Sequence, residues 1–453
     1  TIEDSIKTVA VILFDFTPSI RFTTPTYDEG YYKHFYDSLF FSENYWYSIK
    51  DEHTGLITYS PHPELDEVFG SVRDYYMHQS LRQEQLLGKN NKREIINQPD
   101  SSNTLLPQWV VLPESIQYYN DNFSAAQIDQ IVYDQATVMF GDISGYDGYA
   151  YIYAGDVVTS ISSPFSPQAN GNGYHTGESE FGAFAHIGTH VHELGHALFG
   201  AADEYKGAND EPGLNPMAWS LMATGAQNGP LGYNGHYQCP APFAPPYRIE
   251  LGWTNSIQIS SNVTNQSIIY NRDNPNFYKV DIPNSDEYFI LEERKKDDFD
   301  LYTPTYSTTI GIIIWHAAPS ESPLDFIQIE TADNILNATT YDDDRFGNSV
   351  SSLTDYTSPS SNLRNDNYSF ITFENIEKPQ NIWETDILFY NNAIIIDQNT
   401  TWATNRTLDK SIFIKSGASL EIKNDITFSS AENEEIKFIV EDNSSLKFNG
   451  WKL

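Results

Sequence analysis

Two histidines and a glutamate form the most informative group of chemically active residues in this sequence. His192, Glu193 and His196 belong to the segment Thr189-His-Val-His-Glu-Leu-Gly-His-Ala-Leu-Phe-Gly200. On a helix, residues four apart share a face, with Cβ atoms about 5–6 Å apart. Both imidazole rings can therefore reach one tetrahedral Zn²⁺ through bonds of about 2.0–2.1 Å. The spacing predicts a zinc helix over 189–199.

The glutamate between the histidines has a different predicted role. Glu193 directly follows the first histidine, so we expect it to project beside the metal and not onto it. From there its carboxylate can accept a proton from a water whose pKa the zinc has lowered. Glu193 is therefore the predicted catalytic general base.

A third protein ligand must come from beyond the end of the helix. In an unbroken helix, Asp203 would lie about 16 Å along the axis from His192, too far to share a metal. Gly200 resolves this, because glycine is the usual residue to end a helix in a left-handed conformation. Asp203 is the predicted third ligand and Glu204 the alternative. The fourth position stays open for water, as in catalytic zinc sites.

A methionine follows in the segment Asn215-Pro-Met-Ala-Trp-Ser-Leu-Met-Ala-Thr-Gly225. A tight turn carrying a methionine beneath a zinc site is typical of metzincin-like peptidases. We expect such a Met-turn near 219–225, with Met222 packing under the histidines without coordinating. Tyr205 and Tyr233 are candidate donors of a hydrogen bond to the oxyanion formed on a scissile carbonyl.

Taken together, these motifs resemble the immune inhibitor A family of bacterial metallopeptidases. The resemblance rests on the zinc helix and on flanking motifs in the order found in that family, namely Ser71-Val-Arg-Asp-Tyr-Tyr76, Trp219-Ser-Leu-Met222, Tyr247-Arg-Ile-Glu-Leu-Gly-Trp253, Tyr288-Phe-Ile-Leu-Glu-Glu-Arg294 and Ile312-Ile-Ile-Trp-His316. It implies a secreted, zinc-dependent endopeptidase that acts on protein or peptide substrates and often carries structural Ca²⁺.

The end of the zinc helix departs from that family. Ala197, Leu198 and Phe199 separate His196 from Gly200, where the immune inhibitor A pattern has two residues. The longer spacing is similar to that of IgA-peptidase-like metallopeptidases, which also read Gly-x-x-Asp-Glu-Tyr. The departure bears on the third ligand and on the substrate, and leaves the expected reaction class unchanged.

Composition narrows the expected partners and location. The 453 residues predict two or three domains, and 62 acidic against 26 basic residues give a net charge of −36, which disfavours nucleic acid and anionic lipid as partners. Cys239 is the only cysteine, so neither an intrachain disulfide nor a cysteine-based zinc cluster is expected. No apolar run approaches the roughly 18 residues of a membrane span. A chain starting at Thr1 suits a processed, secreted protein, and we expect a monomer.

Other acidic and histidine residues were weighed as further sites. Asp342-Asp-Asp344 and the group Asp297, Asp298 and Asp300 offer the hard oxygen ligands that Ca²⁺ prefers, although neither has the spacing of a recognised calcium loop. His190 lies two positions before the first ligand and is expected to point away from the metal. We expect His186 and His316 to have structural roles.

The elements that must position these residues indicate an α+β fold. Apolar runs predict strands at 8–16, 147–155, 288–292 and 310–316, and a helix at 125–139. We expect a metzincin-like metallopeptidase domain over 1–380. Residues 381–453 form a predicted β-rich C-terminal region, because Phe413–Ile422 recurs loosely as Phe438–Phe448, the start of a β-solenoid or a small β-sandwich.

Two other classes of function compete with a peptidase. One is an extracellular adhesin or carbohydrate-binding protein with a vestigial zinc site, which the 14% aromatic content permits. The other is a zinc hydrolase acting on bonds other than peptide bonds. The intact combination of His192, Glu193 and His196 favours the peptidase, because a degenerate site usually loses the glutamate first.

Overall fold

The computed structural model shows a mixed α and β protein with more strand than helix. It describes residues 5–20, 36, 39–42, 47–50, 57–60, 70–80, 84–87, 109–156, 163–180, 183–184, 187–204, 217–229, 237–269, 276–295, 298–301, 311–321, 326–332, 344–347, 350–355, 357–364, 367, 369–379, 382–390, 393–408, 410–415, 417–429, 436–440 and 443–449. Statements about structure below refer to these residues.

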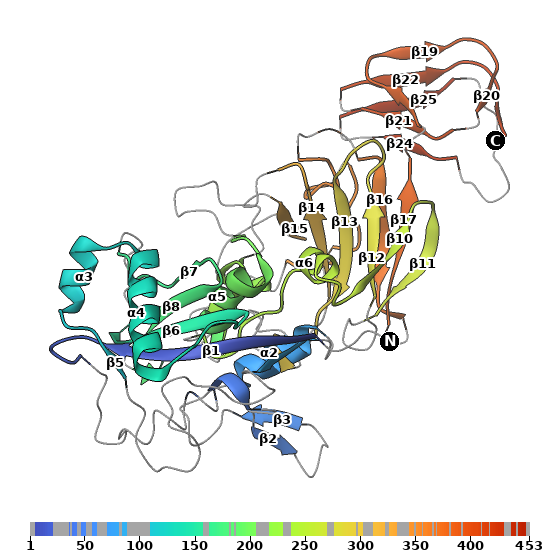
Figure 1. Cartoon of the computed structure of the whole chain (residues 1–453). Coiled ribbons are helices and arrows are strands. Elements are labelled where there is room, and N and C mark those ends of the chain that lie inside the picture. The colour runs from blue at the N-terminus through green and yellow to red at the C-terminus, as the bar shows by residue number, and fades with distance from the viewer. Residues whose placement is uncertain are drawn as a thin grey trace.

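The N-terminal region is built on a mostly parallel sheet (Figure 1). Its path runs β4-β1-β6-β8-β7, in which β4, β1, β6 and β8 are parallel and the edge strand β7 is antiparallel. Short strands β5 and β9 pair with β1 and β8. The bounds are β1 Ser5–Asp15, β4 Glu84–Leu87, β5 Val110–Val111, β6 Gly148–Asp156, β7 Gln168–Asn170, β8 Gly173–Glu180 and β9 Ala183–Phe184.

Helices cover both faces of this sheet. Because side chains alternate along a strand, β1 sends Ala10, Ile12 and Phe14 into one core cluster and Val9, Val11 and Leu13 into another. The first cluster includes residues of α4 and α3, and the second includes residues of α5 and α2. The bounds are α2 Val72–Gln79, α3 Ile116–Asn122, α4 Ala125–Phe140 and α5 Ile187–Phe199.

Two further sheets follow. The first has the order β10-β12-β13-β14-β15 and the second β11-β17-β16. One face of the first sheet packs on the core around α5, through residues such as Ile290 and Trp315, and the other face packs on the second sheet. The bounds are β10 Asn255–Ile259, β11 Val263–Ile268, β12 Asn276–Asp281, β13 Tyr288–Glu293, β14 Ile312–Ala317, β15 Ile327–Glu330, β16 Ile371–Glu377 and β17 Trp383–Phe389.

The C-terminal strands stack in parallel as the coils of a solenoid (Figure 1). Successive strands of a coil enter different sheets, ordered β18-β21-β24, β19-β22-β25 and β20-β23. Leu420 and Ile422 are among the residues that fill its interior. The bounds are β18 Ile394–Ile396, β19 Thr400–Trp402, β20 Arg406–Leu408, β21 Ile412–Ile414, β22 Ser419–Ile422, β23 Ile426–Phe428, β24 Phe438–Val440 and β25 Ser445–Phe448.

Short elements complete the architecture. Strands β2 and β3 form an antiparallel pair. The short helices η2, η3 and α6 follow α5 in the chain and precede β10. The bounds are β2 Tyr47–Lys50, β3 Ile57–Ser60, η2 Met217–Trp219, η3 Thr224–Gln227, α6 Pro245–Glu250 and η4 Asp298–Asp300. Of the helices described, none is both long and apolar enough to cross a membrane.

Several elements expected from the sequence are confirmed. The strands predicted at 8–16, 147–155, 288–292 and 310–316 correspond to β1, β6, β13 and β14, and the helix predicted at 125–139 corresponds to α4. Strand β17 pairs with β11 and β16 of the middle region, so that sheet extends past residue 380. The first strand of the solenoid, β18, begins at Ile394.

Candidate metal centre

Helix α5 is anchored by its apolar face. Ile187, Val191 and Leu194 are fully buried in the core beneath the main sheet, and this burial fixes the opposite face as the one that carries the histidines. The helix ends at Phe199, and Gly200 follows with a φ of +68°. The predicted end of the helix at Gly200 is therefore confirmed. The backbone N–H of Gly200 donates to the carbonyl of His196 at 3.0 Å.

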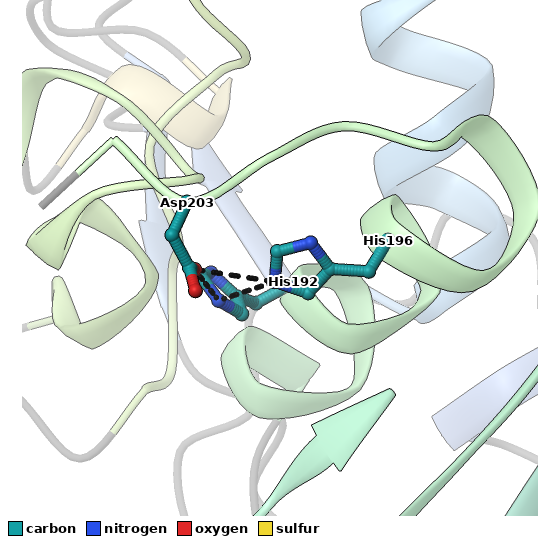
Figure 2. Close-up of side chains that lie close together, drawn as sticks. All are labelled: His192, His196 and Asp203. Atoms are coloured by element: carbon teal, nitrogen blue, oxygen red, sulfur yellow. Dashed lines mark hydrogen bonds and ion pairs between the residues drawn. The ribbon is translucent and has the colours of Figure 1, made fainter. Parts of the chain in front are cut away.

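The reversal after Gly200 brings three predicted ligands together (Figure 2). Oδ1 of Asp203 lies 3.1 Å from Nε2 of His192 and 3.2 Å from Nε2 of His196. The two Nε2 atoms are themselves 3.2 Å apart. The three atoms thus form a nearly equilateral triangle, and this group could hold a metal ion.

The contact made by Nδ1 of each ring determines whether Nε2 carries a proton or a lone pair. Nδ1 of His192 lies 2.9 Å from the carbonyl oxygen of Leu221, and Nδ1 of His196 lies 2.6 Å from that of Ala201. A carbonyl oxygen only accepts, so each Nδ1 must carry the proton and donate it. In the neutral ring, Nε2 then presents a lone pair toward Asp203. Such a second hydrogen bond is what orients metal-ligating histidines in proteins.

Three acceptor atoms at this separation repel one another unless a cation lies among them. Ligand atoms at two corners of a tetrahedron, with bonds of about 2.0 Å to its centre, are about 3.3 Å apart. The observed separations of 3.1 to 3.2 Å match that value. The residues therefore fit a small tetrahedral cation. The side chains of His192, His196 and Asp203 are 9%, 20% and 35% exposed, so the triangle opens to solvent on the side of the acid.

The two neighbouring acids differ in charge state. Burial alone raises the pKa of Asp203, but the adjacent imidazole rings of His192 and His196 hold that pKa well below its ordinary value. Asp203 is therefore an anion at neutral pH. Burial raises the pKa of Glu204 to about 8, and the side chain is 1% exposed. The alternative ligand Glu204 is thus a neutral acid at neutral pH and lies outside the triangle.

Glu193 lies beside the triangle at a buried position. Its side chain is 6% exposed, and burial raises the pKa of its carboxyl group, an effect that the nearby His192 and His196 rings oppose. Glu193 follows His192 on α5, and the hydroxyl of Tyr76 donates to the carbonyl of Val191, two residues before Glu193, at 2.6 Å. Among the described residues, none forms a hydrogen bond or ion pair with the carboxylate of Glu193, so its oxygens are not committed to a structural contact.

The turn containing Met222 packs directly under the helix, as predicted. Met222 is fully buried, and a Cβ placed on Gly195 would lie 2.9 Å from its sulfur and 3.1 Å from Cζ of Phe243. Only a residue without a side chain allows α5 to approach the turn so closely. This approach brings the carbonyl of Leu221 within reach of His192.

The segment carrying Asp203 is held by contacts that the sequence did not reveal. The backbone N–H of Ala202 donates to the hydroxyl of Tyr247 at 3.0 Å, and that of Glu204 donates to the carbonyl of Met222 at 2.8 Å. Tyr247 belonged to a motif that we noted, but nothing in the motif indicated this role. Contacts made by backbone carbonyls leave no signal in side-chain identity.

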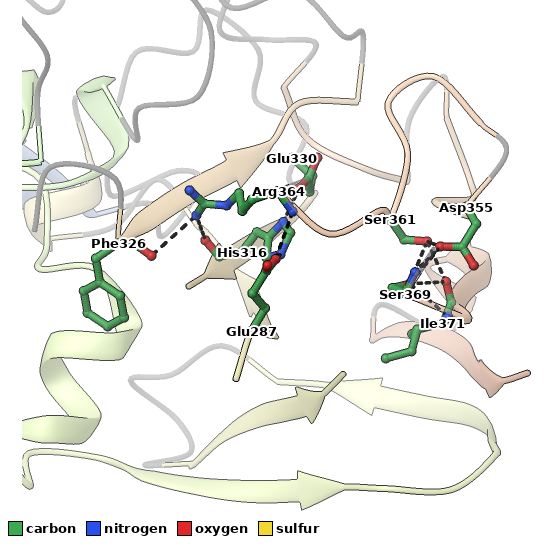
Figure 3. Close-up of polar contacts among 9 residues, drawn as sticks. All are labelled: Glu287, His316, Phe326, Glu330, Asp355, Ser361, Arg364, Ser369 and Ile371. Carbon is green, nitrogen blue, oxygen red and sulfur yellow. Dashed lines mark hydrogen bonds and ion pairs between the residues drawn. The ribbon is translucent and has the colours of Figure 1, made fainter. Parts of the chain in front are cut away.

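Other residues singled out in the sequence have structural contacts. His190 is fully buried, and its Nδ1 lies 2.7 Å from the hydroxyl of Tyr174, in agreement with the expected structural role. His316 is buried between two acids (Figure 3), with Nε2 2.8 Å from Glu287 and Nδ1 2.8 Å from Glu330. The remaining candidates lie outside the described residues, namely His186, Tyr205 and Tyr233.

The proposed calcium clusters are only partly described. Asp344 accepts a hydrogen bond from the indole N–H of Trp219 at 2.9 Å, and Asp300 pairs with Arg294 at 2.5 Å. Asp297, Asp342 and Asp343 lie outside the described residues. Within the described part of the chain, His192, His196 and Asp203 are the one group of three possible ligands. Bound Ca²⁺ stays a prediction.

Comparison with known proteins adds no relative. No family model matches the chain, and no curated protein matches its sequence. The case for a function therefore depends on the arrangement of the residues described above.

Proposed function

We propose that the chain is a secreted zinc-dependent endopeptidase with a metzincin-like catalytic domain, similar to the immune inhibitor A family. The observation that carries this proposal is the triangle formed by Nε2 of His192, Nε2 of His196 and Oδ1 of Asp203, with both Nδ1 atoms committed to backbone carbonyls. The packing of Met222 under α5 supports the metzincin-like part.

The donor set favours zinc over Ca²⁺ and Mg²⁺. Two imidazole nitrogens and one carboxylate oxygen in a tetrahedral arrangement suit Zn²⁺, whereas Ca²⁺ and Mg²⁺ prefer six or more oxygen ligands. With three protein ligands, one position remains for a water or a substrate carbonyl. A zinc ion held there supplies Lewis-acid chemistry, since it polarises a carbonyl and lowers the pKa of water toward neutrality.

The protein's own contribution to peptide hydrolysis is proton transfer by Glu193. Its carboxylate adjoins the ligand face and is free of structural contacts among the described residues, so it can accept a proton from the attacking water. Burial raises its pKa, which makes the carboxylate a stronger base toward the attacking water, and a pKa closer to the working pH is the best compromise between accepting and releasing a proton. The same carboxylic acid then donates the proton to the leaving amine.

The experiment combines metal analysis with a protease assay. The purified chain is expected to contain one zinc and to hydrolyse casein, and a chelator should abolish the activity until zinc is restored. Glu193→Gln keeps the size of the side chain but removes the base, so it should retain zinc and lose about a hundredfold to ten-thousandfold in turnover. Glu250→Gln, at an exposed position on α6, is the matched control. Zinc binding by the wild type without any proteolysis would contradict the proposal.

A further inference from the structure

A second site lies on the opposite face of the main sheet from the metal centre. Helix α4, the segment 144–146, the start of β6 and the turn between β7 and β8 line a cavity of about 600 Å³ that is open to solvent. Small-molecule sites in proteins span about 300–1,000 Å³. The cavity is on the side of the sheet covered by α4, whereas α5 packs on the other side. It is therefore separate from the proposed peptidase site.

Tyrosine rings make up much of the cavity wall. Tyr133, Tyr146, Tyr149 and Tyr151 all line it. The rings of Tyr149 and Tyr151 are nearly parallel, at 10° with centroids 6.1 Å apart, while Tyr133 meets Tyr149 at 81°. Gly173 makes room for this wall, because a Cβ there would lie 2.9 Å from Cε2 of Tyr151. Tyr146, Tyr149 and Tyr151 are 5–6% exposed, so each presents a small part of its apolar ring to the cavity, and Tyr133 is partly exposed.

A buried carboxylate is fixed at the same cavity. Asp129 is 6% exposed, with Oδ1 2.8 Å from Nδ1 of His175 and Oδ2 accepting from the amide of Asn170 at 2.9 Å. Nε2 of His175 faces the carbonyl of Ser166 at 3.1 Å, so both nitrogens of this buried ring face acceptor oxygens. A carboxylate has about four lone-pair positions. These two contacts leave acceptor capacity for a ligand hydroxyl.

The remaining lining residues favour a neutral, hydrogen-bonding ligand. Gln130, Ser144 and Asn172 add amide and hydroxyl groups that both donate and accept. The described residues that line the cavity include no lysine or arginine, so a phosphate or carboxylate ligand would have no counter-ion there. Both oxygens of Asp129 already have partners in His175 and Asn170, which reduces the attraction of this carboxylate for a cation.

We propose that this cavity binds a saccharide of one or two rings. Sugars present an apolar C–H face and a rim of hydroxyls, which match phenol rings beside a fixed carboxylate and amides. In this arrangement the hydroxyls donate to Asp129 and exchange hydrogen bonds with Gln130 and Asn172, while the C–H face packs on the tyrosine wall. The proposal does not depend on the metal or on peptidase activity.

Saturation-transfer NMR on the full chain tests this directly. The probes are maltose, cellobiose, lactose and N,N′-diacetylchitobiose at millimolar concentration, with N-acetyl-lysine amide as a cationic probe. Ala126 lines the cavity at an exposed position of α4, so Ala126→Trp should block it. Gln135→Trp adds the same side chain at an exposed position of α4 outside the cavity lining and is the matched control. Gln130→Ala, also exposed, removes a hydrogen-bonding partner without adding bulk.

The expected result is saturable binding of at least one disaccharide to the wild type and to Gln135→Trp. Its Kd should rise at least tenfold in Ala126→Trp and severalfold in Gln130→Ala, with casein hydrolysis unchanged in all three variants. The proposal is overturned if no disaccharide binds, if only the cationic probe binds, or if Ala126→Trp binds as tightly as the wild type. Because the readout is sugar binding, its failure is distinct from a failure of the proteolysis assay.

Discussion

Two clusters in this molecule combine histidines with carboxylates, but the histidine nitrogens have different partners in each. At His316, both ring nitrogens face carboxylates, Glu287 at 2.8 Å and Glu330 at 2.8 Å. At His192 and His196, one nitrogen of each ring faces a backbone carbonyl, and the other faces Asp203 and the second ring. The partner of the second ring nitrogen determines whether the cluster is satisfied within the protein or could hold a metal ion.

The His316 cluster is complete within the protein. Its ring donates to both carboxylates as an imidazolium, and the guanidinium of Arg364 adds a donor to the carbonyl of His316 at 2.6 Å (Figure 3). The candidate metal centre instead gathers three acceptors around one point, and no lysine or arginine of the described residues pairs with Asp203 there. A histidine beside an acid is therefore a weak indication of a metal site by itself. Two rings with Nδ1 committed to carbonyls make a much stronger one.

The largest expected effect is a difference in zinc content between a variant of the candidate metal centre and a variant of the His316 cluster. His192→Ala removes one of three ligands and should abolish both zinc binding and casein hydrolysis. His316→Gln should leave one zinc per chain and near-normal turnover per folded molecule. Inductively coupled plasma mass spectrometry and a casein assay on both variants test this contrast. Loss of zinc in His316→Gln, with the fold intact by circular dichroism, would show that the two clusters are coupled.

A second comparison sets Asp203 against Glu204. Asp203→Asn replaces an anionic ligand with a neutral, weaker one, so the affinity for zinc should fall by about a hundredfold or more, as titration against a fluorescent chelator would measure. Glu204→Gln replaces an acid that is already neutral at pH 7, and its zinc affinity should stay within about threefold of the wild type. Reversed effects would make Glu204 the third ligand.

The His316 cluster should reveal itself through the pH dependence of stability. Burial lowers the pKa of His316, but hydrogen bonds to Glu287 and Glu330 raise it above 6.5 overall, so its contribution is present below 6.5 and is lost as pH rises through the raised value. Burial raises the pKa of Glu287, but the bond from His316 lowers it below 4.5 overall, so its contribution is lost as pH falls through the lowered value.

The free energy of unfolding lost in His316→Gln should therefore be largest between about pH 4.5 and pH 6.5. Breaking a buried pair by removing one partner costs about 3 kcal/mol. Urea unfolding of the wild type and the variant from pH 3.5 to pH 9 measures this difference. A difference that does not change with pH would show that the ring contributes by packing alone.

Tyr247→Phe is expected to have the smallest effect of these substitutions. It removes the hydroxyl that accepts from the N–H of Ala202 at 3.0 Å and donates to the carbonyl of Ala202 at 3.3 Å, so the segment bearing Asp203 loses both contacts, worth about 1 kcal/mol together. Zinc affinity should fall by about fivefold, while the unfolding midpoint of the metal-free protein changes little. A zinc affinity equal to that of the wild type would mean that the Met222 carbonyl holds the segment without help.

The sequence predicted the grouping of His192, His196 and Asp203 more completely than it predicted the contacts that support this group. The spacing of His192 and His196, the glycine that ends the helix and the acid three residues later are all local in sequence, so helix geometry and the reversal at Gly200 relate them. Leu221 and Tyr247 act from elsewhere in the chain, and a carbonyl contact is independent of side-chain type. Their roles depend on tertiary packing that no local pattern encodes.

The same limit applies to the fold and to the second cluster. Apolar runs located β1, β6, β13, β14 and α4, because burial on both faces of a strand or along one face of a helix leaves a periodic pattern. The order of strands in the main sheet, and the pairing of His316 with acids 14 and 29 residues away, arise from long-range contacts. The tyrosine wall of the α4 cavity likewise joins residues from separate elements.

The most direct test of the central claim is X-ray absorption spectroscopy at the zinc edge on the purified chain. The account predicts one zinc per molecule with two histidine nitrogens at about 2.0 Å and one or two oxygens at similar distance. In Asp203→Asn the oxygen shell should change while the histidine signal stays. A chain that folds without retaining zinc, or a spectrum without histidine ligands, would contradict it.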